Sequence, residues 1–207
     1  MEAIAVIATG MGVAWASGVN LYATVAVLGI MGATGSMVLP PELQVLQSDG
    51  IILAALVMFF IEFFADKVPG LDSGWDAVHT FIRIPAGAIL AAQAVGEVSQ
   101  EAQIVAFLLG GAVAGSAHAT KAGARLVINT SPEPFSNWAA SVIEDVAAVT
   151  ALWVAFNHPW VMAGFVAAFF LFALWFVPRV WRLLKGALRK VAGGFGEGSR
   201  ATPPPVG

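Results

Sequence analysis

The sequence contains no cysteine, which excludes disulfide bonds, thiolate metal sites and a cysteine nucleophile. It also has little charge: only 11% of its 207 residues are Asp, Glu, Lys or Arg, whereas about 25% is usual in a soluble domain. Hydrophobic residues make up 58% of the chain, and the mean hydropathy is +0.82. Because so few charges cannot cover a water-exposed surface of this size, the composition predicts an integral membrane protein.

Several short functional motifs are also missing. The chain has no phosphate-cradling glycine loop, no nucleophile elbow, no HExxH zinc motif and no nucleic-acid-binding module. Residues 1–20 contain no Lys or Arg, whereas a cleaved signal peptide begins with basic residues. We therefore expect a retained first apolar segment, no cofactor and no nucleic-acid partner.

Six apolar stretches approach the ~20 residues that a helix needs to cross a bilayer. They lie at 4–32, 50–66, 79–96, 103–127, 138–157 and 160–178, with Pro and Gly between most of them. The sequence therefore predicts an all-α integral membrane protein with a six-span helical bundle over residues 1–178. The third stretch is short and contains Arg83 and Pro85, so a broken or re-entrant segment at 66–87 is an alternative there.

Basic residues are distributed unevenly between the predicted connections. Most Lys and Arg residues lie in 67–78, 122–137 and 179–207, whereas 33–49 and 97–102 contain none. Positively charged connections stay on the cytoplasmic side of a membrane. With six spans, the pattern predicts a multi-pass protein of the bacterial inner (plasma) membrane with cytoplasmic N- and C-termini.

The end of the chain combines a basic helix with a Gly- and Pro-rich segment. Residues 179–192 can form an amphipathic helix whose basic side chains are Arg179, Arg182, Lys185, Arg189 and Lys190. Such helices lie on anionic membrane surfaces, so we expect a cytoplasmic interfacial helix that contacts the anionic lipids of the inner leaflet. Residues 193–207 are predicted to be a disordered tail.

Ionisable residues are concentrated where the second apolar stretch ends and the third begins. They are Glu62, Asp66, Lys67, Asp72, Asp76, His79 and Arg83. From Asp72 onward they recur every three or four residues, which puts them on one face of a helix. Further ionisable residues lie at the same predicted membrane depth: His118, Lys121, Arg125, Glu144 and Asp145. The six-span topology therefore gathers both groups in the cytoplasmic half of the membrane.

Charged side chains at membrane depth need a cavity or a partner, since inserting each one into the bilayer costs a free energy of about 2.5–3.5 kcal/mol on insertion scales. Our leading hypothesis is a transporter or channel-like protein, whose charged residues form a cavity that binds an ion, a small solute or a lipid headgroup, or carry protons. Asn20 and Tyr22 would line this cavity. His79 and His118 would support pH-dependent gating, because histidine titrates near neutrality. A site for a divalent metal, formed by His79 with Asp72 and Asp76 and helped by Glu62 or Glu144, is an alternative.

Two other classes of function are alternatives. The first is an intramembrane enzyme acting on a lipid or polyprenyl phosphate, with basic residues gripping the phosphate. The second is a structural or assembly subunit in which the charges form an ion-pair scaffold. In that case the small residues Gly110, Gly111, Ala114 and Gly115 would let helices of a homo-oligomer approach closely.

Three segments resemble a known family. They are SGVNLYATV at 17–25, E-x3-DKVPGLD-x3-D-x2-HTFIRIPAGA across 62–88, and HATKAGARLVINTSPEP followed by SVIEDVAA across 118–148. Together they resemble domain-of-unknown-function family 4126, a group of small bacterial inner-membrane proteins, over roughly residues 10–160. The resemblance implies that most of the ionisable residues named above match the family pattern, and it implies no specific activity.

Overall fold

The computed structural model describes residues 2–68, 70–96, 98–130 and 134–197, most of which are helical. The helices are α1 (Glu2–Val19), α2 (Leu21–Ala33), the 3-10 helix η1 (Pro41–Gln47), α3 (Asp49–Ala65), α4 (Leu71–Val95), α5 (Gln100–Ile128), α6 (Pro134–Asn157) and α7 (Pro159–Glu197). These described ranges contain no strand, which confirms the predicted all-α class.

Four of these helices, α4 to α7, are long and apolar enough to cross a membrane. η1 and α3 together could make a fifth crossing, with a bend of 70° between them. The outer faces of the helices expose large apolar side chains such as Leu53, Phe81 and Leu171, and soluble monomers rarely expose extensive apolar surface. The fold is therefore compatible with a multi-pass membrane protein.

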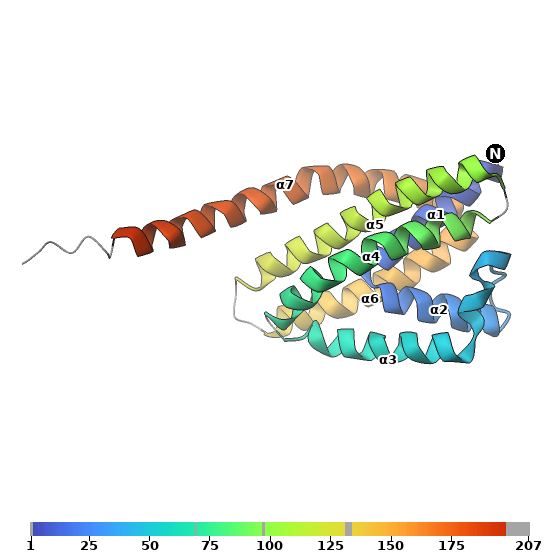
Figure 1. The fold of residues 1–207 in the computed structure, drawn as a ribbon, viewed down its shortest axis with the longest axis horizontal. Coiled ribbons are helices and arrows are strands. Elements are labelled where there is room, and N and C mark those ends of the chain that lie inside the picture. The colour runs from blue at the N-terminus through green and yellow to red at the C-terminus, as the bar shows by residue number, and fades with distance from the viewer. Residues whose placement is uncertain (1, 69, 97, 131–133, 198–207) are drawn as a thin grey trace, which may run out of the picture.

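The predicted first span, within 4–32, is not one crossing helix, because the chain turns back at Asn20 (Figure 1). Val6 of α1 and Leu39 beyond α2 line one cavity together with Val95 at the end of α4, so both outer ends of the α1–α2 pair lie at the same end of the bundle. Asn20 has an extended backbone, and its Oδ1 accepts a hydrogen bond from Ala23 N (2.9 Å), which caps α2. We call this pair the α1–α2 hairpin.

The hairpin places the start of α1 and the end of α7 at opposite ends of the bundle (Figure 1). This arrangement differs from the predicted topology, in which six crossings bring both termini to one side. The chain also breaks at 66–70 rather than inside the third apolar stretch, since α4 is continuous through Pro85. Within the predicted broken or re-entrant segment at 66–87, α4 is thus continuous from Leu71 onward. A further break, inside a predicted span, occurs at Asn20.

Helix α7 runs without interruption from the predicted sixth span, through Pro178, into the basic segment. Its distal part extends beyond the rest of the bundle (Figure 1). Residues 193–197 of the predicted tail belong to this helix, and residues 198–207 lie outside the described residues. The predicted boundary at residue 179 thus coincides with no break in the helix.

Helix α1 lies at the centre of the bundle and packs against α4, α5, α6 and α7. Small side chains make this packing close: a Cβ added to Gly87 of α4 would lie 2.8 Å from Ser17 Oγ of α1 and would also overlap Ala114 of α5. On α5, a Cβ on Gly110 would overlap the Cβ of Ala91 of α4. The small-residue face of α5, predicted to serve a homo-oligomer, is therefore used at least partly inside this bundle.

Replacing Gly87 with Ala should destabilise the protein, because the new Cβ has no room between α1 and α5. Overpacking of this kind costs about 1–3 kcal/mol, which lowers the melting temperature by roughly 2–12 °C at about 2–4 °C per kcal/mol. Gly164→Ala is the matched control, since nothing lies within 4 Å of its added Cβ. Thermal unfolding of purified protein in detergent measures both, and equal melting temperatures would contradict the described packing.

Candidate functional site

One lysine lies among four carboxylates in the interior of the bundle. Lys121 Nζ of α5 is 2.9 Å from Asp66 Oδ2, 3.0 Å from Glu62 Oε1, 3.6 Å from Glu144 Oε2 and 4.0 Å from Asp76 Oδ1. These carboxylates come from the end of α3, from α4 and from α6. Because the ammonium is nearly excluded from solvent, it depends on these partners for its stability.

Arg83 of α4 joins the same cluster. Its Nη2 pairs with Glu62 Oε1, and its Nη1 lies 3.3 Å from Asp76 Oδ1. Nη1 also lies 3.3 Å from the carbonyl oxygen of Val19, at the end of α1. The tip of the α1–α2 hairpin therefore contacts this cluster directly.

Arg125 of α5 completes the set of cations. Its Nη2 lies 2.6 Å from Glu144 Oε2 and 3.4 Å from Asp66 Oδ2. Its Nη1 donates to the backbone carbonyls of Asp66 (2.9 Å) and Asn137 (3.0 Å). We name the whole set the buried ion network: Glu62, Asp66, Asp76, Arg83, Lys121, Arg125 and Glu144.

The spacing of these residues along the helices explains how they meet. Glu62 and Asp66, four residues apart, face inward from the end of α3, and Lys121 and Arg125 face them with the same spacing from α5. Residues seven apart on a helix also share a face, which places Asp76 near Arg83 on α4. Each helix thus presents one charged face to the interior and an apolar face to the outside.

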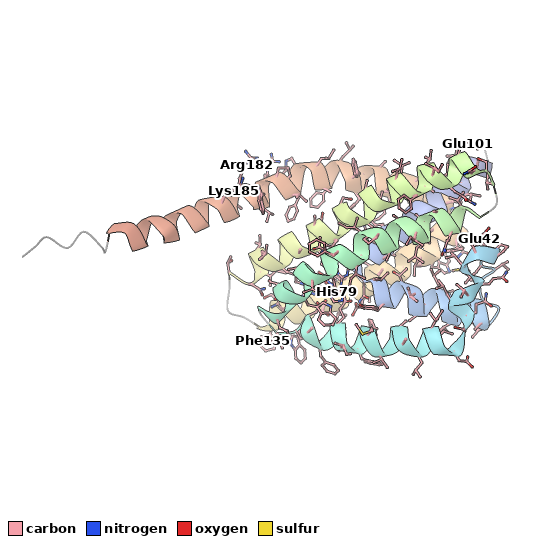
Figure 2. The ribbon with its side chains drawn as sticks, in the orientation of Figure 1. Glu42, His79, Glu101, Phe135, Arg182 and Lys185 are labelled. Atoms are coloured by element: carbon pink, nitrogen blue, oxygen red, sulfur yellow. The ribbon has the colours of Figure 1, made fainter. Side chains whose placement is uncertain are left out.

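Both predicted polar residues of the hairpin contact the surrounding helices. Asn20 Nδ2 donates to Asp145 Oδ1 (2.9 Å) on α6. Tyr22 OH lies 3.0 Å from His79 Nε2, while His79 Nδ1 lies 2.8 Å from the carbonyl oxygen of Trp75. A carbonyl only accepts hydrogen bonds, so Nδ1 carries a proton and Nε2 is free to accept the Tyr22 hydrogen. A neutral histidine with this tautomer would make both contacts of His79, which Figure 2 labels.

His118 is also neutral in this arrangement. Its Nδ1 lies 3.3 Å from Arg83 Nη1, which can only donate, so Nδ1 must be the acceptor. Its Nε2 then carries the hydrogen and lies 3.1 Å from the carbonyl oxygen of Asp76 and 2.8 Å from Thr80 Oγ1. His118 therefore adds no positive charge to the buried ion network.

Four of the predicted ionisable residues make their described contacts outside the network: His79 and Asp145, given above, and Lys67 and Asp72. Lys67 lies outside the helices, where its Nζ is 2.8 Å from the centroid of the Phe63 ring and 3.4 Å from Ser141 Oγ. Partial burial lowers the pKa of this ammonium, and the nearby carboxylates of Asp145 and Asp66 oppose that effect.

Asp72 is held by amides instead of cations. Its Oδ1 accepts from the backbone N–H groups of Gly70 (2.8 Å) and Ser73 (2.6 Å) at the start of α4. Both of its oxygens also accept from Asn129 Nδ2, and Asn137 Nδ2 donates to Asn129 Oδ1 (2.8 Å). Sequence reasoning missed both asparagines, because they show no spacing pattern and only their position near the charged helix ends marks them.

Three buried carboxylate oxygens of the network have no hydrogen-bond partner: Glu62 Oε2, Asp66 Oδ1 and Asp76 Oδ2. In each residue the other oxygen contacts cations. Among the described residues, no group of three or more His, Asp or Glu side chains has the geometry to hold a metal ion. The network is therefore rich in acceptors without forming a metal site in that part of the chain.

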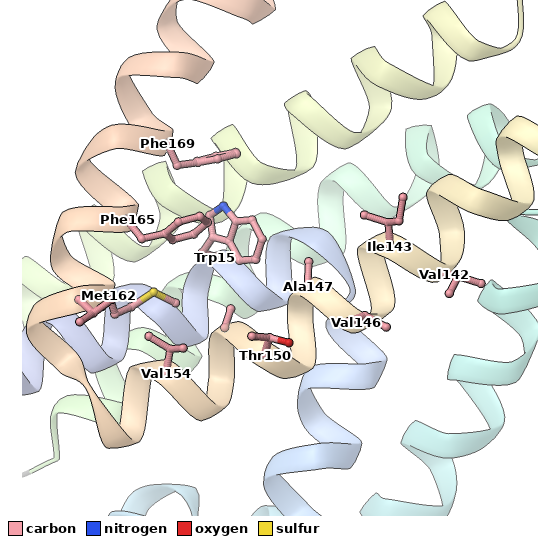
Figure 3. Close-up of a pocket in the computed structure, with 12 residues that line it drawn as sticks. Trp15, Val142, Ile143, Val146, Ala147, Thr150, Val154, Met162, Phe165 and Phe169 are labelled. Atoms are coloured by element: carbon pink, nitrogen blue, oxygen red, sulfur yellow. The ribbon is translucent and has the colours of Figure 1, made fainter.

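The described cavities lie away from the charges. A groove of about 660 Å³ runs between α6 and α7, with Trp15 at its base and Thr150 as one of its few polar lining residues (Figure 3). Another, of about 440 Å³, is lined by apolar residues of α2, α3 and α4 and by Tyr22. No residue of the buried ion network lines either groove or the two smaller cavities. The charged side chains pack against one another rather than around these spaces.

Comparison with known proteins places this architecture in one family. A family model described as "Domain of unknown function (DUF4126)" matches residues 7–179, which include both the α1–α2 hairpin and the buried ion network. No curated protein and no solved structure matches the chain.

Glu62→Gln should strongly destabilise the protein, because it leaves Arg83 and Lys121 buried with less compensating charge. Removing one partner of a buried ion pair costs about 3–5 kcal/mol. Glu101→Gln, an amide substitution at an exposed acid at the start of α5, serves as the control and should melt at the wild-type temperature. A Glu62→Gln protein that melts like the control would show that the ion pairs contribute nothing to stability.

Proposed function

We propose that this chain, which belongs to the domain-of-unknown-function family DUF4126, is a membrane transporter for a small ion or solute. The observation that carries the proposal is the buried ion network in contact with the tip of a helical hairpin that does not cross the bundle. Secondary transporters build their sites from such interrupted helices, whose ends and unwound carbonyls face the bound species. Here the Val19 carbonyl faces Arg83, and Asn20 links the start of α2 to Asp145.

The proposed topology has five crossings, by α3 to α7, in the bacterial inner membrane. The C-terminal ends of α3 and α5 lie toward the same end of the bundle as Arg182, whereas Glu42 and Glu101 lie at the other end (Figures 1 and 2). The positive-inside rule then makes the end of α7 cytoplasmic and the start of α1 external. The α1–α2 hairpin would enter from the external side and reach the network halfway across.

The transport cycle would begin from a closed state, since all network charges except that of Glu144 are nearly excluded from solvent and none lines a described cavity. The carboxylates would coordinate a cation or carry a coupling proton, and the three basic side chains would neutralise them or hold an anionic group. Movement of the hairpin would break the contacts of Val19 with Arg83 and of Asn20 with Asp145, which hold its tip. This movement would open the network to the external side.

The end of α7 would anchor the protein to anionic lipid. Arg179 lies 4.1 Å from the Trp175 ring and Lys185 Nζ lies 5.3 Å from the Trp181 ring. Paired aromatic and basic side chains suit the membrane interface, where rings sit at headgroup level and cations meet negative lipids. Arg189 and Lys190 continue the same helix.

An ion-pair scaffold is the second candidate function. One observation favours it: the network residues contact each other and line none of the described cavities. In that case the charges would only fix the register of α3, α4, α5 and α6. The flux measurement below separates the two candidates.

Cysteine accessibility tests the five-crossing topology, and the natural chain is already a cysteine-free background. In intact cells, a membrane-impermeant maleimide should label Ala3→Cys and Ser36→Cys, both exposed at the end that we place outside. Arg182→Cys should react only after the membrane is permeabilised. If Ala3→Cys stays protected while Ser36→Cys reacts, the N-terminus is cytoplasmic and the hairpin would have to be a crossing span.

Proteoliposomes that contain a pH-sensitive dye test the transport role. Inward gradients of Na⁺, K⁺ and inorganic phosphate are imposed in turn, with and without a membrane potential. We expect at least one condition to change the internal pH faster than in protein-free liposomes. Asp76→Asn should return the rate to the protein-free value, and Glu101→Gln should keep the wild-type rate. A wild-type protein that gives no flux under any condition would contradict transport and favour the scaffold.

A further inference from the structure

The charges of the buried ion network do not balance. Its four carboxylates share three cations, and the hydrogen-bond geometry of His118 makes that residue neutral. If every carboxylate were ionised, one negative charge would remain uncompensated in an apolar bundle. Such a charge is costly at membrane depth, and groups in this position usually become neutral instead.

Asp76 is the carboxylate that its partners hold least closely. Glu62 and Asp66 each have a cation nitrogen within 3.0 Å, whereas the nearest cation to Asp76 is Arg83 Nη1 at 3.3 Å. Lys121 Nζ is 4.0 Å away, and Asp76 Oδ2 has no partner. Of these three buried carboxylates, Asp76 therefore loses the least electrostatic attraction to the cations when it is neutralised.

The arginine beside Asp76 is shared with other acceptors. Arg83 Nη1 has two hydrogens and three acceptors, each at 3.3 Å: Asp76 Oδ1, His118 Nδ1 and the Val19 carbonyl oxygen. Two of these contacts come from α4 and α5, and the third comes from the hairpin tip. The hairpin thus competes with Asp76 for its nearest positive charge.

We propose that Asp76 is a proton-binding site, occupied while the α1–α2 hairpin contacts Arg83 and released when the hairpin withdraws. In the arrangement described here, a proton from water adds to Asp76 and leaves a neutral network. Withdrawal of Val19 frees Arg83 Nη1 to pair fully with the Asp76 carboxylate. The ionised form is then stabilised, and the proton returns to water.

The other charged groups around Asp76 fit this assignment. Glu62 and Asp66 face it from α3 and disfavour a further negative charge. Arg83 on the same helix and Lys121 on α5 favour a negative charge on Asp76. Both cations, however, lie closer to Glu62 or Asp66 than to Asp76. Glu144 on α6 also interacts with Lys121, because its Oε2 lies 3.6 Å from Lys121 Nζ. A metal cation in place of the proton would need several convergent ligands, and the described residues provide no such group.

The physiological meaning of a proton site at Asp76 rests on the proposed transport role. The site itself can be tested without measuring transport. Asp76→Asn replaces one neutral group with another, so its melting temperature in detergent should stay within about 4 °C of wild type. Asp66→Asn makes the same chemical change at an ionised carboxylate that is paired with Lys121 and Arg125. It should melt about 10 °C or more below wild type. An equal decrease in the melting temperature of both variants, or failure of Asp76→Asn to fold, would overturn the proposal.

Infrared spectroscopy identifies the protonated group directly. At pH 7 the wild-type protein and Glu101→Gln should show the C=O stretching band of a protonated carboxyl group, and Asp76→Asn should lack it. No band in the wild type, or a band that persists in Asp76→Asn and disappears in Asp145→Asn, would overturn the assignment. A band at Asp76 in a protein that shows no flux would keep the proton site and remove the transport role.

Discussion

The contact between Lys121 and its four carboxylates is the interaction on which the bundle depends. Its ammonium brings together α3, α4, α5 and α6 at one depth, and the carboxylates that it contacts bind Arg83 and Arg125 in turn. Because the outer faces of these helices are apolar, their rotation is specified by these charged inner faces together with close contacts of small residues such as Gly87 and Gly110. Buried charges tolerate few alternative arrangements, since a misplaced one would be left without a partner.

The interruption of the first apolar segment at Asn20 is the second feature on which the charged cluster depends. A straight helix over 4–32 would fill the centre of the bundle and offer no backbone groups to the charges. The break instead presents the Val19 carbonyl to Arg83 and the Asn20 amide to Asp145. Irregular backbone is tolerated at membrane depth only where protein satisfies its polar groups, and here the charged helices do so.

Local spacing in the sequence predicted much of the site but little of its connectivity. The four-residue steps of Glu62 with Asp66 and of Lys121 with Arg125 place each pair on one inward face. Positive-inside reasoning placed the basic connections at one end. Which acid meets which base depends on helix rotation and separation, which spacing alone does not determine.

The hairpin was harder to foresee. The segment 4–32 is almost continuously apolar, so hydropathy treats it as one long span. Its reversal rests on contacts with residues more than sixty positions away, at Arg83 and Asp145. The sequence predicted only that Asn20 lines a cavity, because whether such a residue lines a cavity or turns the chain is decided by tertiary structure. The amide chain from Asn137 through Asn129 to Asp72 was missed for the same reason.

The position of the hairpin also constrains how the protein is made. A ribosome delivers α1 and α2 first, yet α1 packs against α4, α5, α6 and α7, which are synthesised later. In the proposed membrane setting, the polar tip at Asn20 would have no partners until those helices exist and could not stably leave water. The α1–α2 hairpin would therefore reach its final place only after the helices that surround it. Biogenesis would then include a stage in which this segment waits at the membrane surface.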